Sequence, residues 1–544
     1  MIRLLLLIFL TPCCFSAAKE LRSVTPANGS TAIDPGTTFN LQFHEAIDTN
    51  SLQHIQIRSG GKAITVKYST DLTNASITVV PVDFLEPDRD YILSGEKGLK
   101  TAAGKPVSAF RLLYQTGAAA RVGSTTFDGQ VFDKTRSMTT VLFGPDRKLY
   151  AASAFGELVC YDVDASGKPS NRTTIIQDKS TSRQYIDLEW DPAASSDNLI
   201  LWVSYAERLT PKRNPGHFFT GEIAKLTIKE KKLTGNQVIV TGLPHGREKQ
   251  GDSETLPHQP NGLCFKGGKL YQSVGSTSSS GGPPNWGLKE QAFSACIIEI
   301  DYQDIKTTVD LFQVDSHPRV RRFATGVRNA LEIVAHSNGN LYTAVNINDR
   351  AGRRDGVPDD PDIPGDQNEL IKATTPDHES LYILERGRHY GFPNPSIGNY
   401  VLGGGNPTAS DLDPFQIGDY PVGTQPEKGF APELMYPLWQ YGGTSPNGMI
   451  EYRPEFRHPL SGALLCCFYS ANSIAVMPPG ENGMPGSVKF LQSRKGRLQC
   501  NGPLDITQDP KSGCLYIADF GKQRVFGKDG SMLWLAPSFQ KPSL

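Results

Sequence analysis

A short pattern recurs six times after residue 127, and it constrains the fold more than any other feature of the chain. In each copy a polar turn leads into a strand that begins with Leu-Tyr or a similar pair, and another strand follows. The copies are residues 145–150, 198–202, 267–271, 338–342, 461–465 and 512–516. A small sheet of this kind cannot bury both of its faces alone, so radial stacking of several sheets is the natural solution. We therefore predict a six-bladed β-propeller over residues 127–535, with an irregular array of β-sandwiches as the alternative.

The composition agrees with an all-β fold. The chain has 544 residues, of which 53 are Gly and 39 are Pro, and this content favours short strands and turns over long helices. The length predicts at least two folding units. Lys and Arg total 55 against 56 for Asp and Glu. Because the chain carries no net field that would attract a polyanion, we expect no nucleic acid partner.

The first 18 residues have the features of a secretory signal peptide. Arg3 precedes an apolar run from Leu4 to Leu10, and small residues suited to cleavage follow. The run is too short to span a bilayer, and no later segment has the roughly 20 apolar residues that spanning needs. We expect a secreted or periplasmic protein without a transmembrane segment. A lipid anchor on Cys13 or Cys14 is the alternative, although Pro12 fits that signal badly.

Seven cysteines follow the signal peptide. Several lie in apolar strand-like runs, where a thiol behaves as a small buried hydrophobe. One or two disulfides are the alternative in an exported protein. The seven are Cys160, Cys264, Cys296, Cys466, Cys467, Cys500 and Cys514.

Residues 21–117 form a separate unit of alternating strand patterns, at 38–43, 75–80 and 110–114. Period-two alternation at this spacing predicts a small antiparallel sandwich. The segments 24–30, 85–91 and 114–117 resemble the bacterial immunoglobulin-like (Ig-like) module first recognised in surface-layer proteins. The resemblance implies a spacer or adhesion module, with a cell surface or a polysaccharide as its contact.

His258 is the first candidate catalytic residue. It follows an acidic stretch and directly precedes a strand pattern, and an imidazole in such a loop can take a proton from a hydroxyl group. The alternative for a loop histidine is a structural role. Residues 257–263 and 269–275 closely resemble the catalytic-histidine segment of the soluble glucose and aldose sugar dehydrogenases that use pyrroloquinoline quinone (PQQ). The resemblance implies that His258 is the base.

Arg328 and Asn329 form a second part of the same resemblance. Residues 324–329 match the Gly-x-Arg-Asn segment of the glucose and sorbosone dehydrogenase family, in which the arginine lies against the quinone. A permanently charged guanidinium can stabilise the negative charge that hydride addition places on a quinone oxygen. The resemblance implies that Arg328 is catalytic and that Asn329 contacts the cofactor.

An acidic, turn-rich insertion follows, from Asn346 to Glu369. Its seven acids could form a calcium site, because Ca²⁺ takes six to eight oxygen ligands, and a solvated loop is the alternative. The segment 366–371 resembles the family's acidic stretch near its calcium, and the family's cofactor-bridging calcium uses backbone oxygens from the start of this loop. The predicted metal ligands are Asn346, Ile347, Asp366 and Glu369.

The loop at 445–452 resembles another family loop near the cofactor and implies a cofactor contact for Asn447. The chain then departs from the family, which holds the carboxylates of PQQ with a lysine in the fifth blade and arginines before the last-blade strand. Ala471-Asn472 and Asn501-Gly502-Pro503 stand there instead. Charge-assisted pairs are what such sites rely on. We therefore assign this role to Arg494 or Arg497, with Lys495 as a further candidate.

Taken together, these resemblances predict a quinoprotein that oxidises an aldose or related sugar with PQQ and Ca²⁺. Its partners would be a small sugar substrate and a separate electron acceptor. The alternatives are a calcium-dependent, lactonase-like hydrolase and a propeller without cofactor that binds carbohydrate or another protein.

Overall fold

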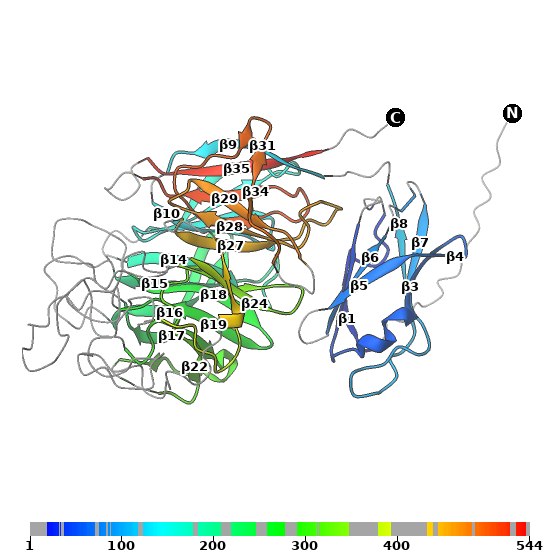
Figure 1. The fold of residues 1–544 in the computed structure, drawn as a ribbon, viewed down its shortest axis with the longest axis horizontal. Helices are drawn as coiled ribbons and strands as arrows, with labels where there is room; N and C mark the ends of the chain where they lie inside the picture. The colour runs from blue at the N-terminus through cyan, green and yellow to red at the C-terminus, as the bar shows by residue number, and fades with distance from the viewer. Residues whose placement is uncertain are drawn as a thin grey trace, which may run out of the picture.

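The computed structural model shows an Ig-like sandwich beside a larger ring of sheets (Figure 1). It describes residues 19–31, 33, 37–70, 75–82, 85–86, 89–117, 123–135, 137–177, 183–207, 219–245, 258–277, 291–312, 314, 316–346, 379–392, 432–438, 444–480, 485–522 and 529–539. The predicted all-β fold is confirmed, since strands dominate both units. No described helix is long and apolar enough to cross a membrane.

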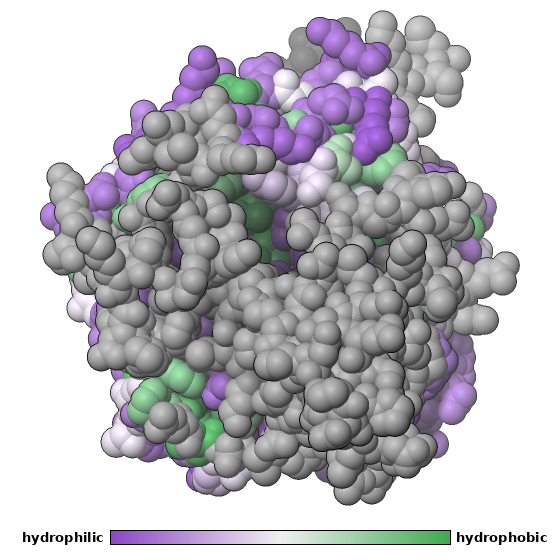
Figure 2. Space-filling view, turned by 60° about the vertical axis from the view of Figure 1, so that its left-hand side comes forward, coloured by the Kyte–Doolittle hydropathy of each residue, from purple (hydrophilic) through white to green (hydrophobic). Residues whose placement is uncertain are grey.

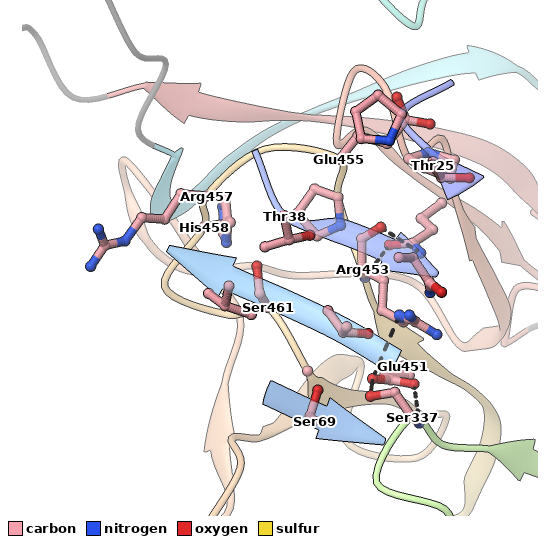
Figure 3. A pocket seen from close by; sticks show the side chains of 18 of the residues that line it. Thr25, Thr38, Ser69, Ser337, Glu451, Arg453, Glu455, Arg457, His458 and Ser461 are labelled. Atoms are coloured by element: carbon pink, nitrogen blue, oxygen red, sulfur yellow. Dashed lines mark hydrogen bonds and ion pairs between the residues drawn. The ribbon is translucent and has the colours of Figure 1, made fainter. Parts of the chain in front are cut away.

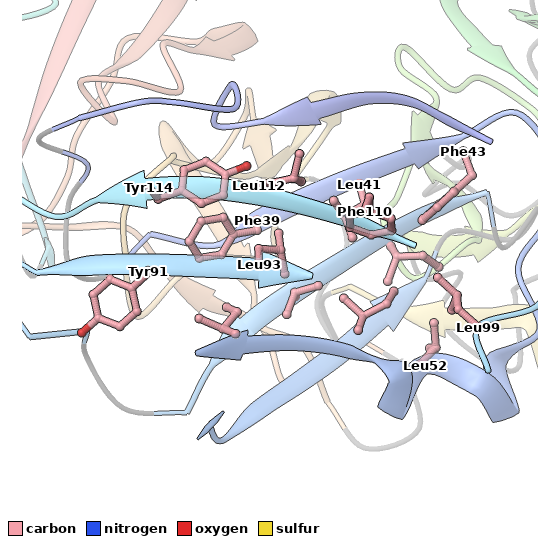
Figure 4. Packing of buried hydrophobic residues seen from close by; sticks show 14 of the residues in the cluster. Phe39, Leu41, Phe43, Leu52, Tyr91, Leu93, Leu99, Phe110, Leu112 and Tyr114 are labelled. Atoms are coloured by element: carbon pink, nitrogen blue, oxygen red, sulfur yellow. The ribbon is translucent and has the colours of Figure 1, made fainter. Parts of the chain in front are cut away.

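The N-terminal unit consists of two four-stranded antiparallel sheets in the orders β1-β2-β6-β5 and β4-β3-β7-β8. The first contains β1 (Leu21–Thr25), β2 (Phe39–Phe43), β5 (Val66–Thr70) and β6 (Ser76–Pro81). The second contains β3 (Ile55–Ser59), β4 (Lys62–Ile64), β7 (Asp90–Gly95) and β8 (Phe110–Gln115), and a 3-10 turn, η1 (Thr49–His54), precedes β3. Alternate residues point inward and form one apolar core between the sheets (Figure 4).

The described residues of the ring form six sheets, which we number as blades in chain order. Blade 1 is β10 (Met138–Phe143), β11 (Lys148–Ser153), β12 (Glu157–Val163) and β13 (Pro169–Gln177). Blade 2 is β14 (Arg183–Trp190), β15 (Leu199–Glu207), β16 (Gly221–Lys229) and β17 (Lys232–Leu243), with β21 (Val309–Asp310) added in parallel. Blade 3 is β18 (Pro260–Lys266), β19 (Lys269–Val274), β20 (Cys296–Ile300) and β22 (Val320–Thr325), with a 3-10 turn, η3 (Tyr302–Asp304), between the last two.

Blade 4 is β23 (Val334–Ala335), β24 (Leu341–Val345), β25 (Ser380–Ile383) and β26 (Met435–Pro437), with a 3-10 turn, η5 (Pro432–Leu434), before the last strand. Blade 5 is β27 (Pro446–Tyr452), β28 (Ala463–Phe468), β29 (Ser473–Met477) and β30 (Lys489–Phe490). Blade 6 has the order β32-β31-β9-β35-β34-β33. Its strands are β9 (Gly123–Asp133), β31 (Gln492–Ser493), β32 (Gly496–Arg497), β33 (Pro503–Gln508), β34 (Leu515–Asp519) and β35 (Ser531–Phe539).

The first strand of each blade is the innermost one, except in blade 6, where β33 takes that place. Neighbouring innermost strands contact each other around the ring, and β33 contacts β10, so the ring closes. Closure is reinforced inside blade 6, where β9 from the start of the propeller pairs with β35 from its end, as the cyan and red strands of Figure 1 show. Such closure leaves no open edge between the first and last blades.

Polar side chains join consecutive blades. Thr139 of blade 1 donates to the Tyr185 carbonyl of blade 2, and the Val141 and Phe143 N–H groups donate to Asp505 and Thr507 of blade 6. Because the partners advance in the same direction on both strands, β10 and β33 run parallel. We call the side on which the innermost strands begin the starting face and the opposite side the ending face.

The seven cysteines beyond residue 18 are free thiols in the structure, and all but the partly exposed Cys500 are buried. Burial raises the pKa of Cys466 and Cys467, which lie in the apolar strand β28. The prediction of buried, hydrophobe-like thiols is therefore confirmed.

Candidate functional site on the starting face

His258 lies directly before β18, at the starting face of blade 3. Its Nδ1 atom lies 2.8 Å from the Ser276 hydroxyl oxygen, which fixes the orientation of the ring. The side chain keeps some solvent contact although protein atoms surround it closely. Burial, and then the positive charge of Arg328, hold the pKa of His258 well below its usual value of 6.5. The imidazole is therefore neutral, and able to accept a proton, at neutral pH.

Arg328 precedes the first strand of blade 4 and is 8% exposed. Its backbone carbonyl accepts a hydrogen bond from the Ser276 N–H at 2.7 Å. Its guanidinium donates to the Asn346 carbonyl at 3.3 Å and lies 5.9 Å from the centre of the Phe392 ring. Ser276 thus contacts both His258 and Arg328, and two blades bring a neutral base and a permanent cation together.

Asn329 supports the same cluster. Its side-chain oxygen accepts a hydrogen bond from Asn261 Nδ2 at 2.9 Å, and the same nitrogen donates to the Ala330 carbonyl. Gly275 packs between the two site segments, because a Cβ atom built there would lie 2.8 Å from both Asn329 Oδ1 and His258 Cβ. A larger residue at position 275 would push the base and Asn329 apart.

Asn346 and Asn447 extend the cluster towards blade 5. The Asn346 N–H donates to the Asn329 carbonyl at 2.8 Å, and its Nδ2 donates to the Pro446 carbonyl at 2.6 Å. Asn447 follows in β27, is buried, and donates to the Ser445 carbonyl. The structure therefore brings five predicted site residues into one connected cluster.

Arg494 and Arg497 make no contact with this cluster among the described residues, and their assignment to the cofactor carboxylates stays a prediction. Arg494 lies in the turn between β31 and β32, is 72% exposed and pairs with Asp128. Arg497 lies in β32, where its guanidinium is 3.6 Å from the centre of the Phe490 ring and donates to the Ala471 carbonyl of blade 5. Both strands form the edge of blade 6 that is farthest from the innermost strand β33.

The remaining predicted metal ligands, Ile347, Asp366 and Glu369, lie outside the described residues. Asn346 is described, and its carbonyl oxygen accepts the Arg328 hydrogen bond noted above. Within the described ranges, no group of three or more His, Cys, Asp and Glu side chains is arranged to hold a metal ion.

Three residues of the cluster were missed by sequence reasoning: Ser276, Asn261 and Gln259. Gln259 is 4% exposed, and its side-chain oxygen has no hydrogen-bond partner in the described part of the chain. All three lie within or next to the segments that resemble the family's histidine region. Their position in those segments was the available signal.

A second polar group, the axial acids, lies deeper in the ring. It contains Asp187 and Glu189 of β14, Glu332 before β23, and Asp505 of β33. Asp187 accepts the Leu263 N–H at 2.7 Å and the Thr140 hydroxyl at 3.3 Å. Burial raises the pKa of all four acids, that of Glu189 to about 8, and their mutual repulsion adds to the effect on Asp187, Glu189 and Glu332. Asp187 accepts a hydrogen bond from blade 3, and Asp505 accepts one from blade 1, so these two acids link neighbouring blades.

The side of the propeller away from the N-terminal unit is hollowed in the space-filling view, and apolar and hydrophilic residues meet in the hollow (Figure 2).

Sequence comparison identifies the family of the N-terminal unit. The family model of the bacterial Ig-like domain matches residues 16–116. This unit is a bacterial Ig-like domain. The comparison with curated proteins gave no significant match.

Among solved structures, the chain is similar to the PQQ-bound aldose sugar dehydrogenase of Streptomyces coelicolor, with 13% identity, a TM-score of 0.46, and coverage of 76% of this chain and 100% of that one. It is also similar to a carbohydrate-active enzyme of family AA12 from Trichoderma reesei, with 15% identity, a TM-score of 0.48, and coverage of 77% of this chain and 98% of that one. A third similar structure is the pyranose dehydrogenase PQQ domain of Coprinopsis cinerea, with 14% identity, a TM-score of 0.47, and coverage of 76% of this chain and 98% of that one. At identities this low, the function of the domain beyond the Ig-like domain has to rest on its own residues.

Proposed function

We propose that the propeller is a quinoprotein oxidoreductase that oxidises an aldose or related sugar, with PQQ as hydride acceptor and Ca²⁺ as an aid. The observation that carries the proposal is the pairing of His258 with Arg328 across two blades. A neutral base and a permanent cation are the two groups that hydride removal from a carbinol carbon requires.

The donor set suits a flat anionic cofactor. Arg328 supplies a buried guanidinium for the negative charge, and the buried side-chain oxygen of Gln259, for which the described residues provide no partner, can accept a hydrogen bond from an N–H or O–H group of the ligand. Arg328 would hold the cofactor, with Asn329 and Asn447 shaping the same wall. When bound, PQQ accepts the hydride from the substrate carbon.

His258 then has a defined task. Its low pKa keeps the imidazole neutral, so it can take the hydroxyl proton while the hydride leaves the same carbon, and the carbinol becomes a carbonyl. Because Nδ1 faces the Ser276 hydroxyl oxygen, we assign the uptake of this proton to Nε2. Arg328 stabilises the negative charge that develops on the acceptor. A separate electron acceptor must remove the two electrons before the next turnover.

Calcium and export belong to the proposal on sequence grounds. The calcium site would use the loop that begins at Asn346, and export follows from the signal peptide predicted for residues 1–18, which are outside the described ranges.

One observation favours a second candidate function, a propeller that binds carbohydrate or protein without cofactor. Arg494 and Arg497 lie at the outer edge of blade 6, and among the described residues neither contacts the cluster of His258 and Arg328. If Arg328 alone does not hold a tricarboxylate, the starting face is a binding surface.

Reconstitution of the purified protein with PQQ and Ca²⁺, followed by dye reduction with a panel of aldoses, tests the proposal. We expect PQQ-dependent turnover that is lost in His258→Ala and kept in His44→Ala, which changes an exposed histidine of the Ig-like domain. Circular dichroism checks that both variants fold. Turnover that persists in His258→Ala contradicts the assigned base. Lactone hydrolysis without PQQ would indicate the hydrolase, and no reaction at all would leave the binding function.

A further inference from the structure

A cleft of about 710 Å³ separates the Ig-like domain from the propeller (Figure 3). This volume is typical of small-ligand sites, which span about 300–1,000 Å³. The cleft is distinct from the site of His258. Its propeller wall includes Ser337 after β23, Arg453 after β27 and Gln508 at the end of β33, and these positions lie on the ending face.

The wall on the Ig-like domain is the outer face of the sheet β1-β2-β6-β5. In β2, the buried residues Phe39, Leu41 and Phe43 alternate with Asn40 and Gln42, which point outward. Strand register places Asn40 opposite Thr78, and Thr78 opposite Ser69 on the edge strand. Directly opposed residues lie on the same face of a sheet.

These three side chains therefore form a polar row across three strands, and all three line the cleft. Asn40 at one end of the row is held by its neighbours. Gln42 Nε2 donates to the Ser76 hydroxyl at 2.7 Å, and Ser76 donates to Asn40 Oδ1 at 3.0 Å. A side chain fixed in this way loses little further freedom when a ligand binds.

The propeller wall is also ordered by its own contacts. Glu451 is buried and accepts hydrogen bonds from the backbone N–H of Ser337 at 2.8 Å and from its hydroxyl. The Arg453 guanidinium lies 3.9 Å from the same carboxylate. Gln508 accepts the Arg453 N–H at 2.8 Å. Figure 3 shows Ser337, Glu451 and Arg453 facing the strands of the Ig-like domain.

The chemistry of the lining selects the kind of ligand. The lining contains two carboxylates, of Glu451 and Glu455, and two guanidinium groups, of Arg453 and Arg457, so it has no excess of either charge to hold an ion. Most other polar lining residues carry hydroxyl or amide groups, which both donate and accept hydrogen bonds.

We propose that this cleft binds a neutral oligosaccharide chain. Sugar hydroxyls also donate and accept, so they match the row of Asn40, Thr78 and Ser69 on one wall and the Glu451 and Arg453 pair on the other. The Ig-like domain is then half of a glycan-binding site rather than a spacer alone. The inference does not depend on the oxidoreductase function, because the two sites lie on opposite faces of the propeller.

Calorimetric titration of the full chain with cellohexaose, maltohexaose and N-acetylchitohexaose tests the proposal. We expect saturable binding of at least one of them. Thr78→Trp fills the middle of the polar row and should weaken that binding at least tenfold. Ser69→Trp, on the exposed edge strand β5, should weaken oligosaccharide binding to a similar extent. It tests the same prediction if Thr78→Trp does not fold. PQQ-dependent dye reduction should be unchanged in both, which separates this proposal from the oxidoreductase function.

Thr227→Trp is the matched control, because Thr227 is an exposed threonine of strand β16 outside the cleft. It should bind the oligosaccharide as the unchanged protein does. The proposal is overturned if none of the three oligosaccharides gives saturable binding, or if the row variants and the control bind equally well. Preference for a polyanion such as dextran sulfate over all three would also overturn it.

Discussion

His258 and Asp187 belong to neighbouring blades, and protein surrounds both side chains, but their partners differ. His258 lies beside a serine and a guanidinium, whereas Asp187 lies beside a backbone N–H, a threonine and other acids. Burial shifts both towards the neutral form, so it lowers the pKa of the histidine and raises that of the acid. On the starting face, the charge of Arg328 therefore lies beside a proton acceptor, His258. Among the axial acids, Asp187 and Asp505 link neighbouring blades.

The largest expected effect is on the starting face. Arg328→Met should lower PQQ-dependent turnover roughly 10²–10³-fold, because it removes the cation that stabilises the developing charge. It should also raise the pKa of His258, since the repulsion by the guanidinium disappears. Dye reduction and an NMR titration of the imidazole measure the two effects. Arg497→Met, at the outer edge of blade 6, should change neither, and an equal loss in that variant would refute the assignment.

The axial acids should dominate the loss of stability as the pH rises from about 4.5 to about 8. The folded-state pKa of Glu189 is raised to about 8, so its stabilising effect is complete below the unfolded value near 4.5 and is lost as the pH rises through about 8. Glu189→Gln should remove this loss, on the order of 1–3 kcal/mol at pH 9. Urea unfolding at pH 5 and pH 9 measures it. The exposed control Glu45→Gln should retain the decline, and a decline of the same size in Glu189→Gln would exclude Glu189 as its source.

His258 should lower the stability of the folded protein as the pH falls, whereas Glu189 lowers it as the pH rises. Its folded-state pKa is lowered, so its contribution to stability is present above pH 6.5 and is lost as the pH falls below that value. Ser276→Asp would place a carboxylate beside Nδ1 and should raise the pKa of His258 by about 1–3 pH units. The acid limb of the turnover profile should move to higher pH by the same amount. Ser276→Ala should lower turnover without that movement, and identical profiles for the two variants would argue against the positioning role of Ser276.

The smallest effect concerns a single link between blades. Thr140→Val removes the hydroxyl that donates to Asp187 and should destabilise the protein by about 0.5–1.5 kcal/mol. Urea unfolding at pH 7 measures the change. The exposed residue Thr227 offers the matched Thr→Val control, which should cost less. Equal costs at the two positions would show that the link contributes nothing.

Local sequence signals predicted the strands well. Each of the six repeated segments coincides with the second strand of one blade or with the turn before it, from β11 to β34. The patterns at 38–43, 75–80 and 110–114 correspond to β2, β6 and β8. Hydrophobic alternation and turn residues act over a few positions, so a sequence displays them directly.

Long-range pairing left no comparable signal. The partnership of β9 with β35, and the place of β31 and β32 at the outer edge of blade 6, depend on segments far apart in the chain. That is why the sequence alone did not place Arg494 and Arg497 relative to the cluster of His258 and Arg328. Asp187 and Asp505 did leave a trace, since each is an acid flanked by apolar residues inside a strand. Such a residue needs a buried partner, and here the partner is a backbone N–H of the next blade.

The β9–β35 pairing also has a consequence for biosynthesis. A ribosome makes β9 before β10 to β34, and its partner strand β35 follows them, so the nascent chain carries an unsatisfied strand edge while the blades between them are made. The Ig-like domain, which precedes β9, has its own complete core by then. A chain that terminates before β35 should therefore contain a folded first domain attached to an aggregation-prone remainder.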